Sequence, residues 1–417
     1  MRKLLTPWRL KWYPRAVLFA LTAGFFIAFF SGSGASTLTG RLGGDFPAFY
    51  SAGRIIVEGD WKNLYSAEKQ ASLQKSLFPG EETSFLVFVN PPFWAMLYAP
   101  LSYLDYRIAY LVHTLFMLST LLLTVWFLSP LNEYIQKNYL LFVSIVLSFC
   151  PMLIAIGGSQ NTALTFLFIV LAWRAVSANR EWLAGIAFGF LLFKPQFALP
   201  LIGLHLLAGR WRILIGVIPV AAIIYTIGVY VTGPFWVADW WQYATWAAKI
   251  DAGINGNNAV CWLGFFQAIS SPQNQIALFL GWGMTIITSI FLAVIWFGGC
   301  RSSDYTAQMA ITASSLMLLP PHSMLYDASI ILFSCFGMIG IFKERSILYL
   351  GAIWPLAYSH YLSKILGFSP LFFVTLYTFL LSVYVFLPSA IGYGTSDNFS
   401  GCFFRSLTSK YAQEKKI

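Results

Sequence analysis

Charged residues are scarce in this chain. Asp, Glu, Lys and Arg make up only 10% of its 417 residues, whereas 58% are hydrophobic and the mean hydropathy is +0.69. A soluble domain carries far more charge on its surface, so that class is excluded. One membrane-spanning helix uses about 20 apolar residues, and the apolar residues here suffice for at most ~12 such helices. The composition therefore indicates an all-α polytopic membrane protein, since backbone polar groups in lipid must be satisfied internally.

The motifs that mark soluble enzymes and metal sites are also missing. The sequence has no GxxxxGK[ST], no GxGxxG after a strand, no HExxH and no GxSxG motif, so nucleotide-dependent cytoplasmic chemistry is not indicated. Its five cysteines are scattered, without a CxxC pair or a histidine cluster, and indicate neither a zinc site nor a disulfide framework. We therefore expect no metal and no cofactor. We assign the formal net charge of +10 to cytoplasmic loops and not to nucleic-acid binding.

Apolar runs and basic loops predict the topology. A first span from Ala16 to about Phe30 follows a basic N-terminus, which places that terminus in the cytoplasm. Cleavage of this run as a signal peptide is the alternative. The chain, 1–417, is then one integral-membrane domain of the inner or plasma membrane with a cytoplasmic tail at 390–417. Eleven further segments give twelve in all, near 107–128, 139–157, 161–176, 182–193, 196–208, 213–232, 276–298, 306–320, 325–342, 347–361 and 369–389.

The longest stretch without a predicted span is 31–106, which we expect to fold outside the membrane on the outer side. Helical amphipathicity over 46–57 and 65–77 predicts helices lying on the outer interface. The run 85–104 is apolar, but Pro91, Pro92 and Pro100 interrupt it. It is predicted to be a re-entrant or interfacial element, with a span as the alternative.

Two further segments have unusual features. The apolar segments on either side of Lys194-Pro195 are too short to cross the bilayer, so they are expected to form a helix pair that meets there, below the outer surface. The stretch 233–246 contains four tryptophans and predicts an amphipathic helix at the outer interface. Stacking of its aromatic rings against a sugar or an isoprenoid is the alternative.

On this topology, polar residues gather at the outer ends of the helices. Ionisable groups at membrane depth are costly and usually face a cavity, so each is a functional candidate. Asp45, which precedes Pro47, suits a helix cap, a general base, or both. Lys194 either binds a phosphate or extends to the outer interface. Substrate contact or a purely structural role is open for the other candidates, which are Asn90, Gln160, Asn161, His322, Tyr326 and Asp327.

At these residues the sequence resembles glycosyltransferase family 87, a group of GT-C-type integral-membrane enzymes that includes the polyprenol-phosphate-mannose-dependent α-mannosyltransferases. The resembling features follow one another along most of the chain: Gly44–Phe46, Tyr50–Gly53, Asn63–Tyr65, Asn90–Phe93, Pro100–Leu101, Gly158–Asn161, Ala184–Gly185, Lys194–Pro195, Pro321–His322 and Tyr326–Asp327. Many GT-C enzymes carry paired acidic residues in the first outer loop, whereas Asp45 has no acidic neighbour. This departure indicates a metal-free site.

The resemblance implies a GT-C-type bundle and an inverting hexosyltransferase, with mannose favoured. Its substrates would be a polyprenyl-phosphate sugar in the outer leaflet and a glycan or glycolipid acceptor. Asp45 would be the general base, and Lys194 and His322 would contact the donor phosphate. Gln160, Asn161, Asn90, Tyr326 and Asp327 would bind substrate or orient those groups.

Other functions remain open at this point. A secondary transporter or lipid flippase would also have many spans and broken helices, although transporters usually carry midplane charges and internal repeats. A non-catalytic assembly partner is a further alternative. Within the enzyme class, the alternative is another GT-C activity, such as transfer of an aminosugar to lipid A or of arabinose.

Overall fold

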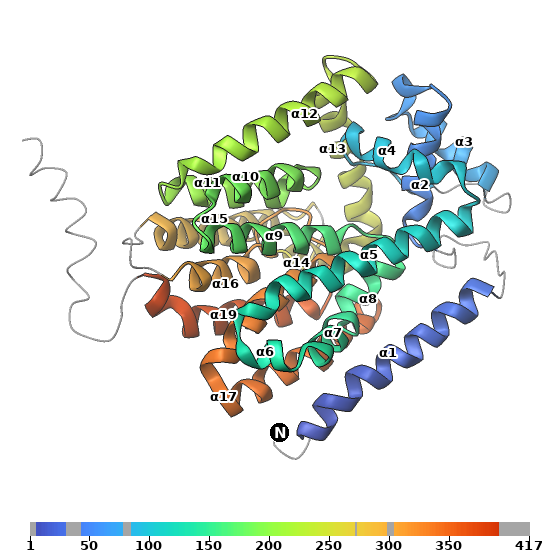
Figure 1. Ribbon diagram of the computed structural model, residues 1–417. Helices are drawn as coiled ribbons and strands as arrows, with labels where there is room; N and C mark the ends of the chain where they lie inside the picture. Colours follow the sequence, from blue (N-terminus) through green and yellow to red (C-terminus); the bar gives the residue numbers. More distant parts are fainter. Residues whose placement is uncertain (1–5, 31–42, 78–84, 272, 298–303, 392–417) are drawn as a thin grey trace, which may run out of the picture.

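The computed structural model describes residues 6–30, 43–77, 85–271, 273–297 and 304–391, without the side chains of 7, 10, 28 and 340–350. The described part of the chain is helical throughout, with a single isolated β-bridge between Ala259 and Met324 (Figure 1). The all-α prediction is confirmed. The predicted tail beyond residue 391 and parts of the 31–106 region lie outside the described residues.

The α-helices differ widely in length. They are α1 (Pro7–Phe30), α2 (Phe46–Val57), α3 (Ala67–Leu77), α4 (Pro92–Tyr98), α5 (Tyr106–Leu128), α6 (Glu133–Lys137), α7 (Tyr139–Leu147), α8 (Cys150–Gly157), α9 (Thr162–Ser177), α10 (Glu181–Phe190), α11 (Pro195–Leu207), α12 (Leu214–Thr232), α13 (Trp236–Asn255), α14 (Trp262–Ala268), α15 (Gln275–Phe297), α16 (Tyr305–Ser315), α17 (Ile331–Leu356), α18 (Ser363–Leu366) and α19 (Leu371–Ala390). Short 3₁₀ helices include η1 (Trp61–Asn63), η2 (Pro100–Tyr103), η4 (Leu191–Phe193), η7 (Leu325–Ile330) and η8 (Ala357–Leu362).

Four helical stretches in the described residues are long and apolar enough to cross a membrane: 106–131, 211–232, 275–297 and 371–390. The pair α7 and α8, bent by 66° at its break, makes a fifth if it counts as one span. The predicted total of twelve spans is therefore not confirmed. Most of the predicted segments are helices, but several, such as α9 and α11, have fewer than 18 residues.

The breaks in the helices largely follow the sequence. The chain changes direction at Lys194, between η4 and α11, as the Lys194-Pro195 break predicts. The run 85–104 forms only the short helices α4 and η2, which are too short to span a bilayer. One prediction is wrong in detail: the gap expected between 342 and 347 lies inside the continuous helix α17.

Helix α2 differs from its prediction as an interfacial helix. Ten of its twelve residues are buried, because α3, α4 and η2 pack around it. Its amphipathic pattern is real, but the apolar side contacts protein. The phenol of Tyr50 donates to the carbonyl of Leu104 over 2.8 Å, and the hydroxyl of Ser102 donates to the Tyr50 carbonyl over 3.0 Å. These bonds fix α2 as part of the protein interior.

Small residues bring α10 and α12 into close contact. A methyl group placed on Gly185 would lie 1.9 Å from the carbonyl oxygen of Ile213, and one placed on Gly189 would lie 2.6 Å from Cβ of Val220. Only glycine permits this approach of two backbones, which is a common way to pack helices in membranes. The contact fixes the position of α10 and hence of the break that carries Lys194.

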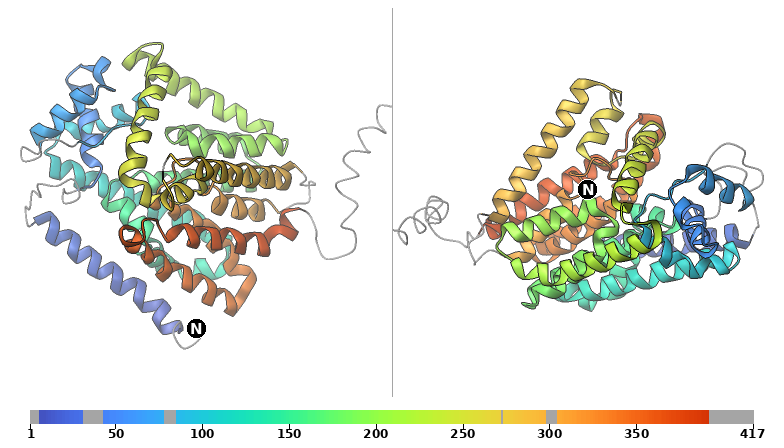
Figure 2. Two further views of the ribbon diagram at one scale, coloured as in Figure 1. Left: turned by 180° about the vertical axis from the view of Figure 1, so that it is seen from behind. Right: turned by 90° about the horizontal axis from the view of Figure 1, so that it is seen from above.

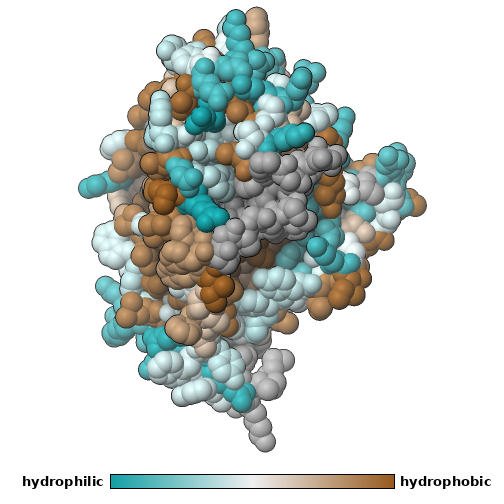
Figure 3. Space-filling view, turned by 90° about the vertical axis from the view of Figure 1, so that its right-hand side faces the viewer, coloured by the Kyte–Doolittle hydropathy of each residue, from teal (hydrophilic) through white to brown (hydrophobic). Residues whose placement is uncertain are grey.

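The longer helices form one bundle, and α2, α3 and α4 lie together at one end of it (Figure 1). Helix α13 runs across the bundle helices beside this group, as both views in Figure 2 show. Viewed from that end, hydrophilic side chains gather in the upper part of the face, among apolar ones (Figure 3). By contrast, the large exposed side chains of α15, including Phe279, Ile286 and Ile290, are apolar and suit contact with lipid.

Candidate active site

Two tight turns meet where α2 begins. The backbone N–H of Asp45 donates to the carbonyl of Gly158 over 3.1 Å, so the turn before α2 contacts the turn between α8 and α9. Gly44 has a φ of +55°, and a methyl group on it would lie 2.7 Å from Cα of Gly158. Because only glycine combines this conformation with this contact, the position of Asp45 is set by main-chain packing.

The carboxylate of Asp45 does not cap α2, although the residue occupies the N-cap position and Pro47 follows it. The prediction of a cap is therefore wrong, because the carboxylate instead accepts a hydrogen bond from Nε2 of Gln160. Burial raises the pKa of Asp45 to about 6, and the negative charge of Asp251 adds to this rise. The hydrogen bond from Gln160 opposes it. The pair Asp45 and Gln160 thus gives a carboxylate that ionises near neutral pH.

Lys194, between η4 and α11, is the second charged candidate. It is only 8% exposed, and its ammonium forms an ion pair with the buried carboxylate of Asp327 in η7. The hydroxyl of Thr162 donates to the same carboxylate oxygen over 3.1 Å. The ammonium also lies 5.6 Å from the ring centroid of Tyr326, within the range of a cation–π contact. Lys194 is therefore a buried, partnered cation and does not extend to the surface.

The start of α9 joins the two charged groups. Gln160 holds Asp45, and Thr162, two residues later, contacts the Asp327 carboxylate that pairs with Lys194. Two carboxylates that lie 115 and 165 residues away in the chain are thus held by Gln160 and Thr162, respectively. We call Asp45, Gln160, Lys194, Tyr326 and Asp327 the outer cluster, after the side of the membrane on which the sequence places them.

One titratable member of the site was not predicted. Asp251, near the end of α13, lies with Oδ2 3.5 Å from Nε2 of His322, and both side chains are partly exposed. Its charge acts on both Asp45 and Tyr326. Asp251 lies in the helix that begins with the tryptophan-rich stretch, on the predicted outer side, so the reasoning that selected Asp45 could have found it.

The model of glycosyltransferase family 87 matches residues 88–321, more than half of the chain. The chain belongs to glycosyltransferase family 87. Membership implies that it is a membrane glycosyltransferase. No curated protein and no solved structure matches the chain.

The family match covers only part of the candidate site in this family 87 chain. Gln160, Lys194 and Asp251 lie within the matched residues, whereas Asp45 precedes them and Asp327 follows them. The fold brings all five to one place. Within the described residues, no group of three or more His, Cys, Asp or Glu side chains is arranged to hold a metal ion.

Two predicted residues have contacts of another kind. Asn161 is 1% exposed, and its amide oxygen accepts from the hydroxyl of Tyr98 over 3.1 Å. That hydroxyl is also 3.3 Å from Nδ1 of the buried His113. The carbonyl of Asn90 accepts from the hydroxyl of Tyr65 over 2.9 Å. Both residues thus support the structure around the outer cluster, and sugar binding by either stays a prediction.

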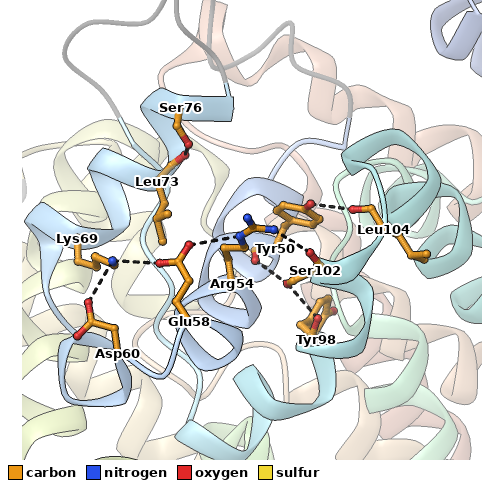
Figure 4. Close-up of polar contacts among 10 residues, drawn as sticks. All are labelled: Tyr50, Arg54, Glu58, Asp60, Lys69, Leu73, Ser76, Tyr98, Ser102 and Leu104. Atoms are coloured by element: carbon orange, nitrogen blue, oxygen red, sulfur yellow. Dashed lines mark hydrogen bonds and ion pairs between the residues drawn. The ribbon is translucent and has the colours of Figure 1, made fainter.

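A separate cluster of polar side chains lies at the C-terminal end of α2 (Figure 4). A pocket of about 190 Å³ lies there, between α2 and α3. Its two charged lining residues are paired, since Arg54 Nε lies 3.3 Å from Glu58. Beside the pocket, Lys69 Nζ lies 3.1 Å from both Glu58 and Asp60. These pairs hold α3 against α2, so we assign them a structural role.

The contact between the two turns can be tested in this transferase. Gly44→Ala should destabilise the protein and lower transfer, because the added methyl group collides with the backbone of Gly158. Gly59→Ala is the matched control, since Gly59 also has a positive φ, +74°, but nothing lies within 4 Å of the added methyl group. Melting temperature and transfer rate should fall further in the Gly44 variant. Equal losses in the two variants would contradict the proposed packing.

Proposed function

We propose that this chain transfers a hexose, mannose being the favoured sugar, from a polyprenyl-phosphate donor to an acceptor hydroxyl, with inversion and without a metal. The observation that carries the proposal is the pairing of Asp45 with Gln160 beside the buried Lys194–Asp327 pair. Gln160 holds the Asp45 carboxylate, and Thr162 contacts the carboxylate that holds Lys194. A carboxylate and a cation connected in this way suit a reaction in which a hydroxyl loses a proton and a phosphate departs.

Asp45 acts as the general base. Its pKa of about 6 is close to the ambient pH, where proton transfer to a carboxylate is most effective. It takes the proton of the acceptor hydroxyl as that oxygen bonds to the anomeric carbon. The bond from this carbon to the phosphate oxygen breaks, and its electron pair leaves with the phosphate. One displacement inverts the anomeric centre. Gln160 holds the carboxylate in place.

Lys194 stabilises the departing phosphate. Its ammonium is buried, and a charge held in a poorly hydrated site acts more strongly on charge that develops during the reaction. Asp327 and Thr162 keep the ammonium in place before the donor binds. His322 and Tyr326 are then positioned to contact the phosphate or the sugar. We assign the site to the outer leaflet and both termini to the cytoplasm, on the distribution of basic residues.

Transfer by purified protein tests the function. The protein is incubated in lipid vesicles with radiolabelled polyprenyl-phosphate mannose, glucose or arabinose, or with a nucleotide sugar, in the presence of a glycolipid acceptor. We expect label in the acceptor from a polyprenyl-phosphate hexose, mannose above all, and none from the nucleotide sugar. Counterflow of label across the vesicles without product would instead support a transporter or flippase. Full activity with nucleotide sugars would overturn the donor assignment.

The pH dependence follows from the raised pKa of Asp45. The base must be ionised, so kcat/KM should be level above pH 7 and fall about tenfold per pH unit below pH 6. Initial rates from pH 4.5 to 8.5 at low donor concentration give this profile. Returning samples to pH 7.5 after the acid incubation controls for unfolding. A profile that stays level down to pH 5 would contradict the assignment of Asp45.

A further inference from the structure

The C-terminal half of α13 is fixed by few contacts. Of the helix's 20 residues only Trp236 and Ala247 are buried. Near its start, the indole N–H of Trp236 donates to the carbonyl of Tyr225 over 3.2 Å, and that of Trp240 donates to Val89 over 2.7 Å. These contacts fix the first turns. The polar contact that joins its last turns to the site comes from Asp251.

Asp251 is held in a defined orientation. Its Oδ1 accepts from Nδ2 of Asn255, one turn later, over 2.6 Å, and its Oδ2 lies 3.5 Å from Nε2 of His322. Each carboxylate oxygen therefore has a different partner. At this separation the two groups form an ion pair when the imidazole is protonated, and a carboxylate beside Nε2 restricts the orientation of the ring and leaves Nδ1 for a substrate.

Main-chain contacts also join the segment after α13 to the segment after His322. Ala259 and Met324 form a β-bridge, and the N–H of Val260 donates to the carbonyl of Ser323 over 2.9 Å. The segment that follows α13 is thus attached to the segment that carries His322. Main-chain bonds therefore hold the segment after α13 close to the segment that carries His322, and they support the contact between Asp251 and His322.

The same carboxylate acts on the outer cluster. Its charge reaches Asp45 at the start of α2 and Tyr326 in η7. The other two charged members of the outer cluster, Lys194 and Asp327, pair with each other. Among the described residues, Asp251 is therefore a negative charge that acts on Asp45 and has no buried cation as its ion-pair partner.

We propose that Asp251 is a positioning residue for the transfer reaction, which holds the imidazole of His322 toward the outer cluster and anchors the end of α13 there. The kinetic part of this inference, the positioning of His322, rests on the proposed function. Removal of Asp251 should leave His322 misaligned and the last turns of α13 free to move away from the site.

Kinetics of Asp251→Asn test the first part, with Asp239→Asn as the matched control. Both substitutions remove one carboxylate from α13, but Asp239 is exposed and lies near Tyr65, away from His322. We expect Asp251→Asn to lower kcat at least about tenfold. The acidic fall in kcat/KM should move to lower pH, because loss of the nearby charge lowers the pKa of Asp45. Asp239→Asn should behave as wild type.

Two further variants separate positioning from a general loss of structure. Asp251→Glu keeps the charge and should retain the acidic fall of the wild type. At pH 7.5, where Asp45 is ionised in every variant, the loss in kcat of the double variant Asp251→Asn/His322→Gln should equal that of His322→Gln alone, because both substitutions then act through one imidazole. Losses that multiply, or an acidic fall that does not move in Asp251→Asn, would overturn the kinetic part.

Hydrogen exchange tests the anchoring without any substrate. Backbone amides of 247–262 should exchange faster in Asp251→Asn than in wild type or Asp239→Asn, while amides of α9 are unchanged. Equal exchange in all three proteins would overturn the anchoring. This measurement needs no donor, so it decides the anchoring even if the wild-type protein transfers no sugar. Absence of transfer would refute the proposed function alone.

Discussion

Asp45→Asn should abolish sugar transfer while donor binding is preserved. Asparagine has the same shape and still offers an oxygen to Gln160, but it cannot take the proton of the acceptor hydroxyl. General bases typically contribute a factor of about 10²–10⁴ to the rate, and we expect a loss of that size in kcat. Initial rates and equilibrium binding of labelled donor measure the two effects separately. Asp239→Asn serves as the control, and near-normal turnover of Asp45→Asn would refute the assignment.

The same substitution should stabilise the fold. Folding raises the pKa of Asp45 from 3.8 to about 6, so stability from this group is present below pH 3.8 and is lost as pH rises to 6. Above pH 6 the loss amounts to at most about 3 kcal/mol for a shift of this size. Asp45→Asn removes it, so the melting temperature at pH 7.5 should rise. A lower melting temperature would show that the loss of activity has a structural component.

Lys194→Met should eliminate transfer and also weaken the fold. Without the ammonium, the buried carboxylate of Asp327 has no cation beside it, and such an unpaired charge costs about 3–5 kcal/mol. Removing charge stabilisation of the leaving phosphate should lower kcat by about 10²–10³. Melting temperature and single-turnover rate are the two measurements. The single variant alone does not separate the two effects.

The double variant Lys194→Met/Asp327→Asn separates them. Neutralising Asp327 removes the unpaired charge, and the amide oxygen still accepts from Thr162. Most of the lost stability should therefore return, while transfer stays absent. Recovery of transfer together with stability would mean that Lys194 only neutralises Asp327, and the phosphate role would then be refuted.

Local sequence features predicted the helix breaks that carry the candidate site residues. A lysine before a proline marked the break between η4 and α11, and the polar turn at 158–161 marked the start of α9. These features act over a few residues, so their consequences can be read directly from the sequence. The resemblance to family 87 then indicated which of them belong together, and the family match agrees with it.

Features that depend on distant partners were not predicted. The carboxylate of Asp45 bonds to Gln160 instead of capping its own helix, because a partner 115 residues away competes with the local backbone. The contact between Asp251 and His322 likewise depends on where α13 crosses the bundle. A hydropathy pattern shows that one side of a helix is apolar but not whether lipid or protein contacts that side. For this reason α2 was assigned to the membrane interface, although protein surrounds it.

The contact between Gly44 and Gly158 has a consequence for redesign of this enzyme. Main-chain atoms make that contact, so the backbone position of the proposed base does not depend on the neighbouring side chains, and among the described side chains only Gln160 holds its carboxylate. Substitutions at neighbouring side chains can therefore alter which sugar or acceptor fits while the base stays where it is. A library that diversifies Asn90, Tyr326 and His322, with both glycines kept, is the natural starting point for new specificities.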